Sequence, residues 1–153
     1  MLKISSSVEY ATRIMVRLSE LGDEETASAE RLSVSENVPR DYVDQILQRL
    51  RRAGLVLSRR GALGGYRLAH APGGISIGNI LHAVDDGVFE SVCDKYADGS
   101  NQCAHTEGCS IRPVWRRLEL LVDDYLSKVS LTQLTETEDC VSSRVSALFE
   151  AAP

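Results

Sequence analysis

Residues 39–54 read PRDYVDQILQRLRRAG, a pattern that predicts one amphipathic helix. Proline suits the first turn of a helix, because its missing N–H would find no intrahelical partner there. Apolar side chains recur at steps of three and four residues and therefore share one face, which comprises Tyr42, Val43, Ile46, Leu47 and Leu50. The opposite face carries polar side chains, namely Arg40, Asp44, Gln45, Gln48, Arg49 and Arg52. Ala53 and Gly54 end the helix.

Two further helices are expected before this one. Residues 7–21 place an apolar stripe on one face, formed by Val8, Ala11, Ile14, Met15, Leu18 and Leu21. Residues 28–36 fit a shorter helix that turns Ala29, Leu32 and Val34 inward, and Asn37 is a suitable left-handed stop. Two helices joined by a short turn, the second with Arg and Gln exposed, are typical of a helix-turn-helix and its recognition helix.

Residues 55–69 read LVLSRRGALGGYRLA and predict a β-hairpin with a basic tip. Glycines at the tip permit positive φ angles and a close approach to another backbone. Arg59 and Arg60 at this tip could enter a narrow minor groove, where the negative potential is enhanced. The hairpin and the helices before it together indicate a winged helix-turn-helix.

The charge is distributed unevenly along the chain. The whole chain has a net charge of −5, but residues 26–70 hold eight basic and four acidic side chains and therefore carry +4. A basic segment on an acidic protein indicates phosphate binding. By charge alone, a solvated helix face explains the segment equally well.

The composition narrows the class of protein. With 153 residues and 43% hydrophobic side chains, the chain forms one compact domain or a small head with an oligomerising arm. Its first residues, MLKISSS, do not resemble a secretion signal, and no stretch is long and apolar enough to cross a bilayer, so we expect a cytoplasmic protein without a membrane partner. The sequence shows neither a Ser/His/acid set nor a phosphate-binding glycine loop, so we do not expect an enzyme. Gly61, Gly64 and Gly65 are interpreted as a wing turn.

Three cysteines, Cys93, Cys103 and Cys109, lie in a polar, glycine-containing stretch after the hairpin. In a chain without a secretion signal, cysteines favour metal or redox chemistry over disulfides. One loop could fold their thiolates around a soft metal centre, and thiolates select zinc, copper or an iron-sulfur cluster. Cys140 lies 31 residues beyond Cys109 and is expected to be a free thiol.

The segment after the cysteines is apolar along one side over some five helical turns. The stripe comprises Ile111, Val114, Trp115, Leu118, Leu121, Val122, Tyr125, Leu126 and Val129. One small head cannot easily cover so long a stripe, whereas a second copy of the same helix could do so with two-fold symmetry. We therefore expect a homodimer that reads two half-sites of a near-palindromic operator in double-stranded DNA. The alternative is a helix packed wholly against its own head.

Seven segments resemble the IscR, NsrR and RirA (Rrf-type) family of bacterial transcription regulators: residues 10–11, 39–47, 50–56, 59–61, 64–69, 75–84 and 130–134. The resemblance implies a mainly α fold with a winged helix-turn-helix head, a small β-hairpin wing and a long dimerisation helix. It divides the chain into a DNA-binding domain (1–84), a cysteine-containing cluster loop (85–110), a dimerisation helix (111–134) and a C-terminal tail (135–153). Many members hold an iron-sulfur cluster on three cysteines of that loop, which implies a repressor that senses nitric oxide, redox state or iron status.

Candidate DNA contacts follow from side-chain chemistry and from this resemblance. Gln45 can pair bidentately with adenine, Arg40 can reach a guanine or a phosphate, and Asp44 can accept from cytosine or form an intrahelical pair with Gln48 or Arg40. The family's base-reading positions match Asp44 and Gln45, and its wing arginine matches Arg59, with Arg60 as a helper. Ser28 and Tyr42 are candidates for phosphate contacts.

The resemblance also bears on the fourth cluster ligand. The histidine that serves IscR-like members is replaced here by Arg112, whereas the aspartate that NsrR-like members take from the other subunit matches Glu9. Glu9 of the partner subunit is therefore the expected fourth ligand, and a capping box with Ser6 is its alternative. His105 is a competing donor.

The polar insert at residues 94–102 leaves both 4Fe-4S and 2Fe-2S clusters open, with structural zinc as a third reading of the loop. A cluster-free regulator of the same family, governed by thiol oxidation, zinc or a protein partner, is the rival function.

Overall fold

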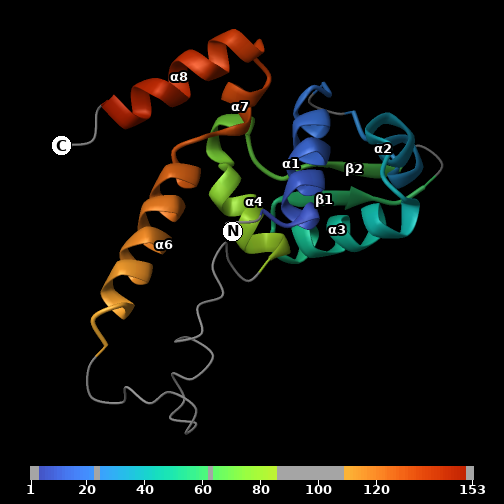
Figure 1. The fold of residues 1–153 in the computed structure, drawn as a ribbon. Coiled ribbons are helices and arrows are strands. Elements are labelled where there is room, and N and C mark those ends of the chain that lie inside the picture. Colours follow the sequence, from blue (N-terminus) through green and yellow to red (C-terminus); the bar gives the residue numbers. More distant parts are fainter. Residues whose placement is uncertain (1–3, 23–24, 62–63, 86–108, 151–153) are drawn as a thin grey trace, which may run out of the picture.

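The computed structural model describes residues 4–22, 25–61, 64–85 and 109–150 (Figure 1). The elements, in chain order, are α1 (Ser6–Ser19), α2 (Ala29–Glu36), α3 (Arg40–Arg52), β1 (Val56–Arg59), β2 (Gly65–Leu68), a 3-10 turn η1 (Pro72–Gly74), α4 (Ile77–Val84), α6 (Arg112–Ser127), α7 (Leu131–Leu134) and α8 (Glu138–Glu150). Helices α1 to α3 and the hairpin form a head, and α6 and α8 project from one side of it (Figure 1). The fold is mainly α with a two-stranded wing, as predicted.

The helix-turn-helix forms for local reasons. Ser28 precedes α2 and its side chain accepts a hydrogen bond from the Arg31 amide, and Asn37 ends α2 in the left-handed conformation with φ 53°. Pro39 is the N-cap of α3. The predicted apolar faces of the three helices meet in one core, whose fully buried members include Ile14, Met15, Leu32, Val43, Leu47 and Leu50. The inward position predicted for Val34 is wrong, because this side chain is 74% exposed on α2.

The wing is an antiparallel hairpin in which Val56 pairs with Leu68 and Arg59 pairs with Gly65. A third piece of extended chain joins it, because Ala27 and Tyr66 exchange two backbone hydrogen bonds of 3.0 and 2.8 Å. This bridge fixes the wing to the chain that enters α2. Gly61 adopts φ 112° beside the tip, where a residue with a Cβ would be strained.

Helix α4 connects the head to the long helix α6. Ser76 and Asn79 form a capping box at its start, and Gly78 packs so closely on Ser127 that an added Cβ would lie 3.2 Å from the Ser127 backbone. His82 Nε2 lies 2.7 Å from Asp123 Oδ1. Contacts at both ends of α4 therefore set the direction in which α6 leaves the head.

The segment predicted as one helix over residues 111–134 is divided in two. Helix α6 ends at Ser127, and α7 starts afresh after Ser130, which forms a capping box with Gln133. The break has a tertiary cause: Ile77 donates its backbone N–H to the Val129 carbonyl and Leu131 donates to the Ile75 carbonyl, both at 2.9 Å. The tail predicted for residues 135–153 contains the 13-residue helix α8. Of the helices that the structure describes, none is long and apolar enough to cross a membrane.

Candidate nucleic-acid interface

Gln45 lies in the middle of the exposed side of α3, as its predicted role requires. Its neighbours Val43, Ile46 and Leu47 are buried and fix the rotation of the helix about its axis. Within the described ranges the Gln45 amide makes no hydrogen bond, so both its donor and its acceptor are available to the edge of a base. The buried neighbours fix the position of Gln45 on the helix, while its side-chain amide has no partner among the described residues.

Arg40 is placed at the start of α3, but two carboxylates engage it. Its Nε donates to Asp44 Oδ2 and its Nη1 donates to Glu30 Oε2, each at 2.9 Å. The hydrogen bond to Glu30 and then the one to Asp44 raise the pKa of the Arg40 guanidinium above its usual value. The intrahelical pair that competes with base reading by Asp44 is thus formed with Arg40. Both side chains are therefore already engaged within the protein, and their charges are partly neutralised before DNA is met.

Tyr42 connects α3 to the start of α1. Its hydroxyl shares a hydrogen bond of 2.8 Å with the Ser7 hydroxyl, and its half-buried ring meets Tyr10 edge to face, with ring centres 5.7 Å apart. The Arg13 guanidinium lies over the Tyr10 ring, 5.8 Å from the ring centroid. The phosphate contact expected of Tyr42 would therefore come from a hydroxyl already fixed by α1.

The remaining predicted contacts lie on exposed ends of elements. Ser28 is exposed and its oxygen accepts from the Arg31 amide at 3.1 Å, which leaves its hydroxyl proton free to be donated to a phosphate. Arg59 and Arg60 are exposed at the end of β1, and no ion pair formed by the described residues engages them. The start of α2 thus presents a hydroxyl, and the wing presents two basic groups.

A buried carboxylate sets the angle between α1 and α2. Glu36, 8% exposed at the last turn of α2, accepts from Arg13 Nε at 3.3 Å and from Arg17 Nε at 3.1 Å. The Arg13 side chain also donates to the Glu36 carbonyl oxygen at 2.6 Å. The hydrogen bond to Glu36, helped by the charge of Glu20, raises the pKa of Arg17. This cluster fixes α2 against α1.

The predicted cluster ligands are only partly described. Cys93, Cys103 and the competing His105 lie outside the described residues. Cys109 is half-buried just before α6, and Cys140 is exposed on α8. In the ranges that the structure describes, no three Cys, His, Asp or Glu side chains are grouped to hold a metal ion.

Glu9 is exposed on the first turns of α1 and is not part of a capping box. Ser5, rather than Ser6, is the N-cap of α1, and its hydroxyl oxygen accepts from the Val8 amide. Among the described residues the Glu9 carboxylate has neither a hydrogen bond nor an ion pair, so it is available to bind a group outside this head.

The sequence matches one protein-family model over residues 4–137, that of Rrf2, described as an iron-dependent transcriptional regulator. The chain belongs to the Rrf2 family. Curated relatives named HTH-type transcriptional regulator IscR include those of Vibrio campbellii, 29% identical over 90% of this chain and 80% of that protein, and of Aliivibrio salmonicida, 31% identical over 87% and 77%.

Solved structures lead to the same family. CymR (YrzC), the global cysteine regulator of B. subtilis, superposes with a TM-score of 0.70 at 30% identity, covering 88% of this chain and 97% of that one. T. potens IscR superposes with a TM-score of 0.67 at 26% identity, covering 86% and 84%. The chain is therefore a DNA-binding transcription regulator of the Rrf2 family and not an enzyme.

Some residues of this Rrf2 protein's interface escape prediction from sequence. The amphipathic pattern places Arg49 and Arg52 on the exposed side of α3, but it cannot show that both line a pocket with Ser7 at the start of α1. The pairing of Arg40 with Glu30 joins α3 to α2, so no pattern within the sequence of either helix predicts it. The run of arginines in the last turn of α3 is the one feature that could have indicated the pocket.

Proposed function

We propose that this Rrf2-family chain is a repressor whose affinity for its operator is set by an iron-sulfur cluster, 4Fe-4S or 2Fe-2S, on Cys93, Cys103 and Cys109. Glu9 of the partner subunit completes the ligand set. The supporting observation is that the Gln45 side-chain amide on α3 and the two wing arginines, Arg59 and Arg60, have no side-chain partner among the described residues, in a chain that also carries three cysteines within seventeen residues of sequence. A regulator of this kind acts in the cytoplasm.

The donor chemistry is suited to iron. Three thiolates and one carboxylate supply four protein ligands, the number that holds a 2Fe-2S or a 4Fe-4S cluster, and thiolates favour iron-sulfur centres. Cys109 is only half-buried and Glu9 is exposed without a partner in the described ranges, so both can reach a group at the surface. When bound, such a cluster supplies sensitivity to nitric oxide, oxidants and iron shortage.

Two hydrogen bonds connect the entrance of the cysteine loop to the DNA-reading helix. The Ser5 hydroxyl donates to Asp85, the last described residue before the loop. Two residues further along α1, Ser7 shares its hydrogen bond with Tyr42 on α3. A loop held in one position fixes the start of α1 through the first contact, and α1 fixes α3 through the second. Release of the loop lowers operator affinity, because α3 then loses its fixed orientation.

We also propose that two copies associate through α6. No side chain of this helix is buried within one chain. The large apolar residues from its start to Leu121 remain exposed, with Val114 at 60%, Trp115 at 47% and Leu121 at 48%, whereas Leu126 near its end packs partly on the core of the head. An exposed apolar stripe of this length is expected to be covered by another surface. A second copy would cover it symmetrically and present two heads to the two half-sites of a near-palindromic operator.

A cluster-free regulator controlled by thiol oxidation, zinc or a protein partner is the second candidate. The structural match to a global cysteine regulator, and to S. aureus CymR in an oxidised form at 27% identity and a TM-score of 0.67, favours it. Its thiol chemistry would fall on the same cysteines or on the exposed Cys140.

Anaerobic purification separates these two candidates. Wild-type protein should be brown, with iron and acid-labile sulfide in matching amounts, and Cys103→Ser should be colourless. Cys140→Ser is the matched control and should keep both colour and iron. Colourless wild-type protein after attempted reconstitution would refute the cluster and leave the thiol-controlled regulator.

A further inference from the structure

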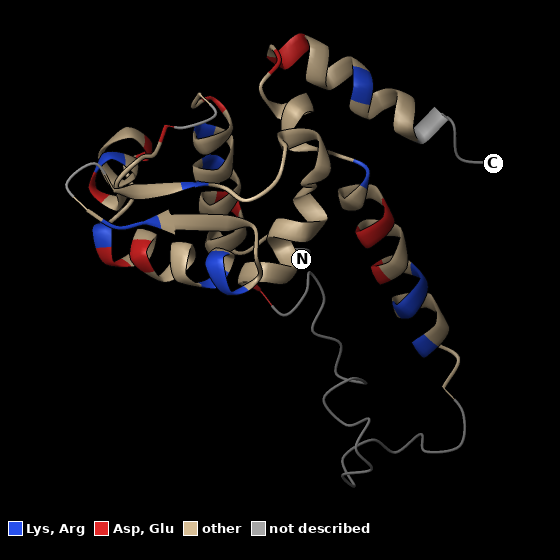
Figure 2. Cartoon of the chain, turned by 180° about the vertical axis from the view of Figure 1, so that it is seen from behind, with Lys and Arg blue, Asp and Glu red and all other residues tan. Residues whose placement is uncertain are grey.

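The charge of the recognition helix changes sign from its first turns to its last turn. Around the start of α3, Arg40 is outnumbered by Asp41, Asp44 and Glu30, and two of these three carboxylates are bonded to it. The last turn carries Arg49, Arg51 and Arg52 and no carboxylate. Figure 2 shows blue and red together at the start of α3 and blue without red at its end. The positive potential that attracts a phosphate therefore lies at the C-terminal end of α3.

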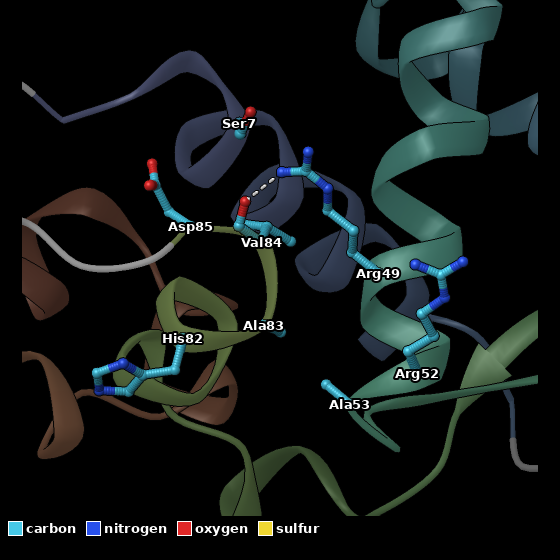
Figure 3. A pocket seen from close by; sticks show the side chains of 8 residues that line it. All are labelled: Ser7, Arg49, Arg52, Ala53, His82, Ala83, Val84 and Asp85. Atoms are coloured by element: carbon cyan, nitrogen blue, oxygen red, sulfur yellow. Dashed lines mark hydrogen bonds between the residues drawn. The ribbon is translucent and has the colours of Figure 1, made fainter.

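A pocket of about 600 Å³ opens at that end, between α3, α4 and the start of α1 (Figure 3). It is lined by Ser7, Arg49, Arg52, Ala53, His82, Ala83, Val84 and Asp85. Arg49 donates one Nη1 hydrogen bond of 2.6 Å to the Val84 carbonyl, so its guanidinium is fixed while other N–H groups stay free. The Arg52 side chain is exposed and forms no hydrogen bond or ion pair with any described residue.

The other polar groups of the pocket are already placed. Asp85 accepts from the Ser5 hydroxyl, and His82 Nε2 is directed to Asp123 on α6. In Figure 3 the His82 ring points away from the two guanidinium groups, while Ser7 lies near that of Arg49. The Ser7 hydroxyl shares its hydrogen bond with Tyr42 but keeps further hydrogen-bonding capacity. The pocket thus offers an anion the remaining N–H groups of Arg49, the Arg52 guanidinium and the Ser7 hydroxyl, beside the Asp85 carboxylate.

The pocket lies on the same side of α3 as the predicted base reader. Gln45, Arg49 and Arg52 follow one another at steps of four and three residues and therefore share a face. Arg52 lies about 10 Å along the helix axis from Gln45, at 1.5 Å per residue. The major groove is about 12 Å wide, so a helix that places Gln45 against a base brings Arg52 to the flanking backbone.

We propose that Arg49 and Arg52, with the Ser7 hydroxyl, bind one backbone phosphate of the duplex that α3 reads. The inference rests on the proposed DNA binding, and it moves the main phosphate contact of α3 from Arg40 to the other end of the helix. Arginine suits this site because its planar guanidinium can donate two parallel hydrogen bonds to a phosphate. The contact fixes the register of the head on DNA and reads no sequence.

The test measures the salt dependence of binding by the full-length chain to a duplex of arbitrary sequence, since phosphate contacts need no operator. Fluorescence anisotropy gives the dissociation constant at several salt concentrations between about 50 and 200 mM. Arg52→Gln should reduce the slope of log K against log salt by about 0.9 for each bound head. Arg52→Lys should keep the wild-type slope, because it keeps the charge. Arg144→Gln on α8 is the control for loss of an arginine elsewhere and should also keep it.

The possible results distinguish failure of the phosphate contact at Arg52 from failure of the proposed DNA binding. Wild-type protein that does not bind duplex DNA refutes the proposed function and this inference together. Wild-type binding with an unchanged slope for Arg52→Gln overturns the inference alone. The pocket would then be a site for free anions if inorganic phosphate, at constant ionic strength, raised the melting temperature of the wild-type protein but not that of Arg52→Gln. Phosphate contact by DNA instead predicts the lower slope.

Discussion

Gly65 offers a test of how the wing is attached to the helix-turn-helix. It is the first residue of β2 and lies against the backbone of Ala27, the residue that bridges the wing to the chain before α2. A Cβ added at Gly65 would lie 2.6 Å from the Ala27 carbonyl oxygen and 2.7 Å from the Ala27 carbonyl carbon. Both are backbone atoms, so no side-chain rotation can relieve the overlap.

The cost of Gly65→Ala can be worked from these distances. The two segments must separate by about 0.8 Å to reach the 3.4 Å of ordinary van der Waals contact. That movement breaks or stretches the two Ala27–Tyr66 backbone hydrogen bonds, each of which contributes about 0.5–1.5 kcal/mol. We therefore expect the free energy of unfolding to fall by about 2 kcal/mol, within the 1–3 kcal/mol range typical of overpacking.

Urea unfolding at fixed protein concentration measures this loss as a lower midpoint with an unchanged m-value. Gly74→Ala is the matched control, since an added Cβ there meets no atom within 4 Å and its backbone is not left-handed. That variant should be neutral or more stable by up to about 1 kcal/mol. A Gly65→Ala protein within about 0.5 kcal/mol of wild type would refute the reasoning.

Three further changes test other parts of the molecule. Asp44→Asn should tighten binding to duplex of arbitrary sequence, because it removes one of the two carboxylates that engage Arg40 and a charge that repels phosphate. The free energy of unfolding should barely change, because the Arg40–Asp44 pair is exposed; anisotropy and urea unfolding check both. Leu121→Glu should convert a dimer into monomers in sedimentation analysis, because it places a charge on the exposed stripe of α6. Glu9→Gln should speed loss of iron to a chelator about tenfold or more, whereas Glu20→Gln, at the C-cap of the same helix, should not.

For each of these three variants, one result would contradict the expectation. Unchanged or weaker binding by the Asp44 variant would mean that its carboxylate itself contacts DNA. A Leu121 variant that remains dimeric would place the interface away from α6. Equal iron loss from the Glu9 variant and wild type would exclude Glu9 as a ligand.

The sequence predicts those parts of the fold that depend on neighbours along the chain. The recurrence of apolar residues places α1 and α3 within two residues of their observed ends. Asn37 stops α2 because its short polar side chain tolerates the left-handed conformation, a local property. The exposed position of Gln45 follows from the same periodicity.

Contacts between segments that lie far apart in the sequence cannot be predicted from these local patterns. The break between α6 and α7 arises because Ile77 and Leu131 form hydrogen bonds across more than fifty residues of sequence, and the helical pattern continues through it. Arg40 has the same residue type and position that a DNA contact needs, yet Glu30 on another helix engages it. Arg49 acquires its place in the pocket only because the last turn of α4 lies beside α3.

Operator affinity in the two cluster states is the most direct test of the proposed regulator. The full-length, cluster-loaded protein first selects its preferred sequence from a random duplex pool under anaerobic conditions. The dissociation constant for that duplex is then measured for the loaded protein and for the same protein after removal of the cluster. We expect the loaded form to bind more tightly by about 5- to 150-fold, the usual range for coupled sites. Equal affinities of the two forms would contradict control by the cluster.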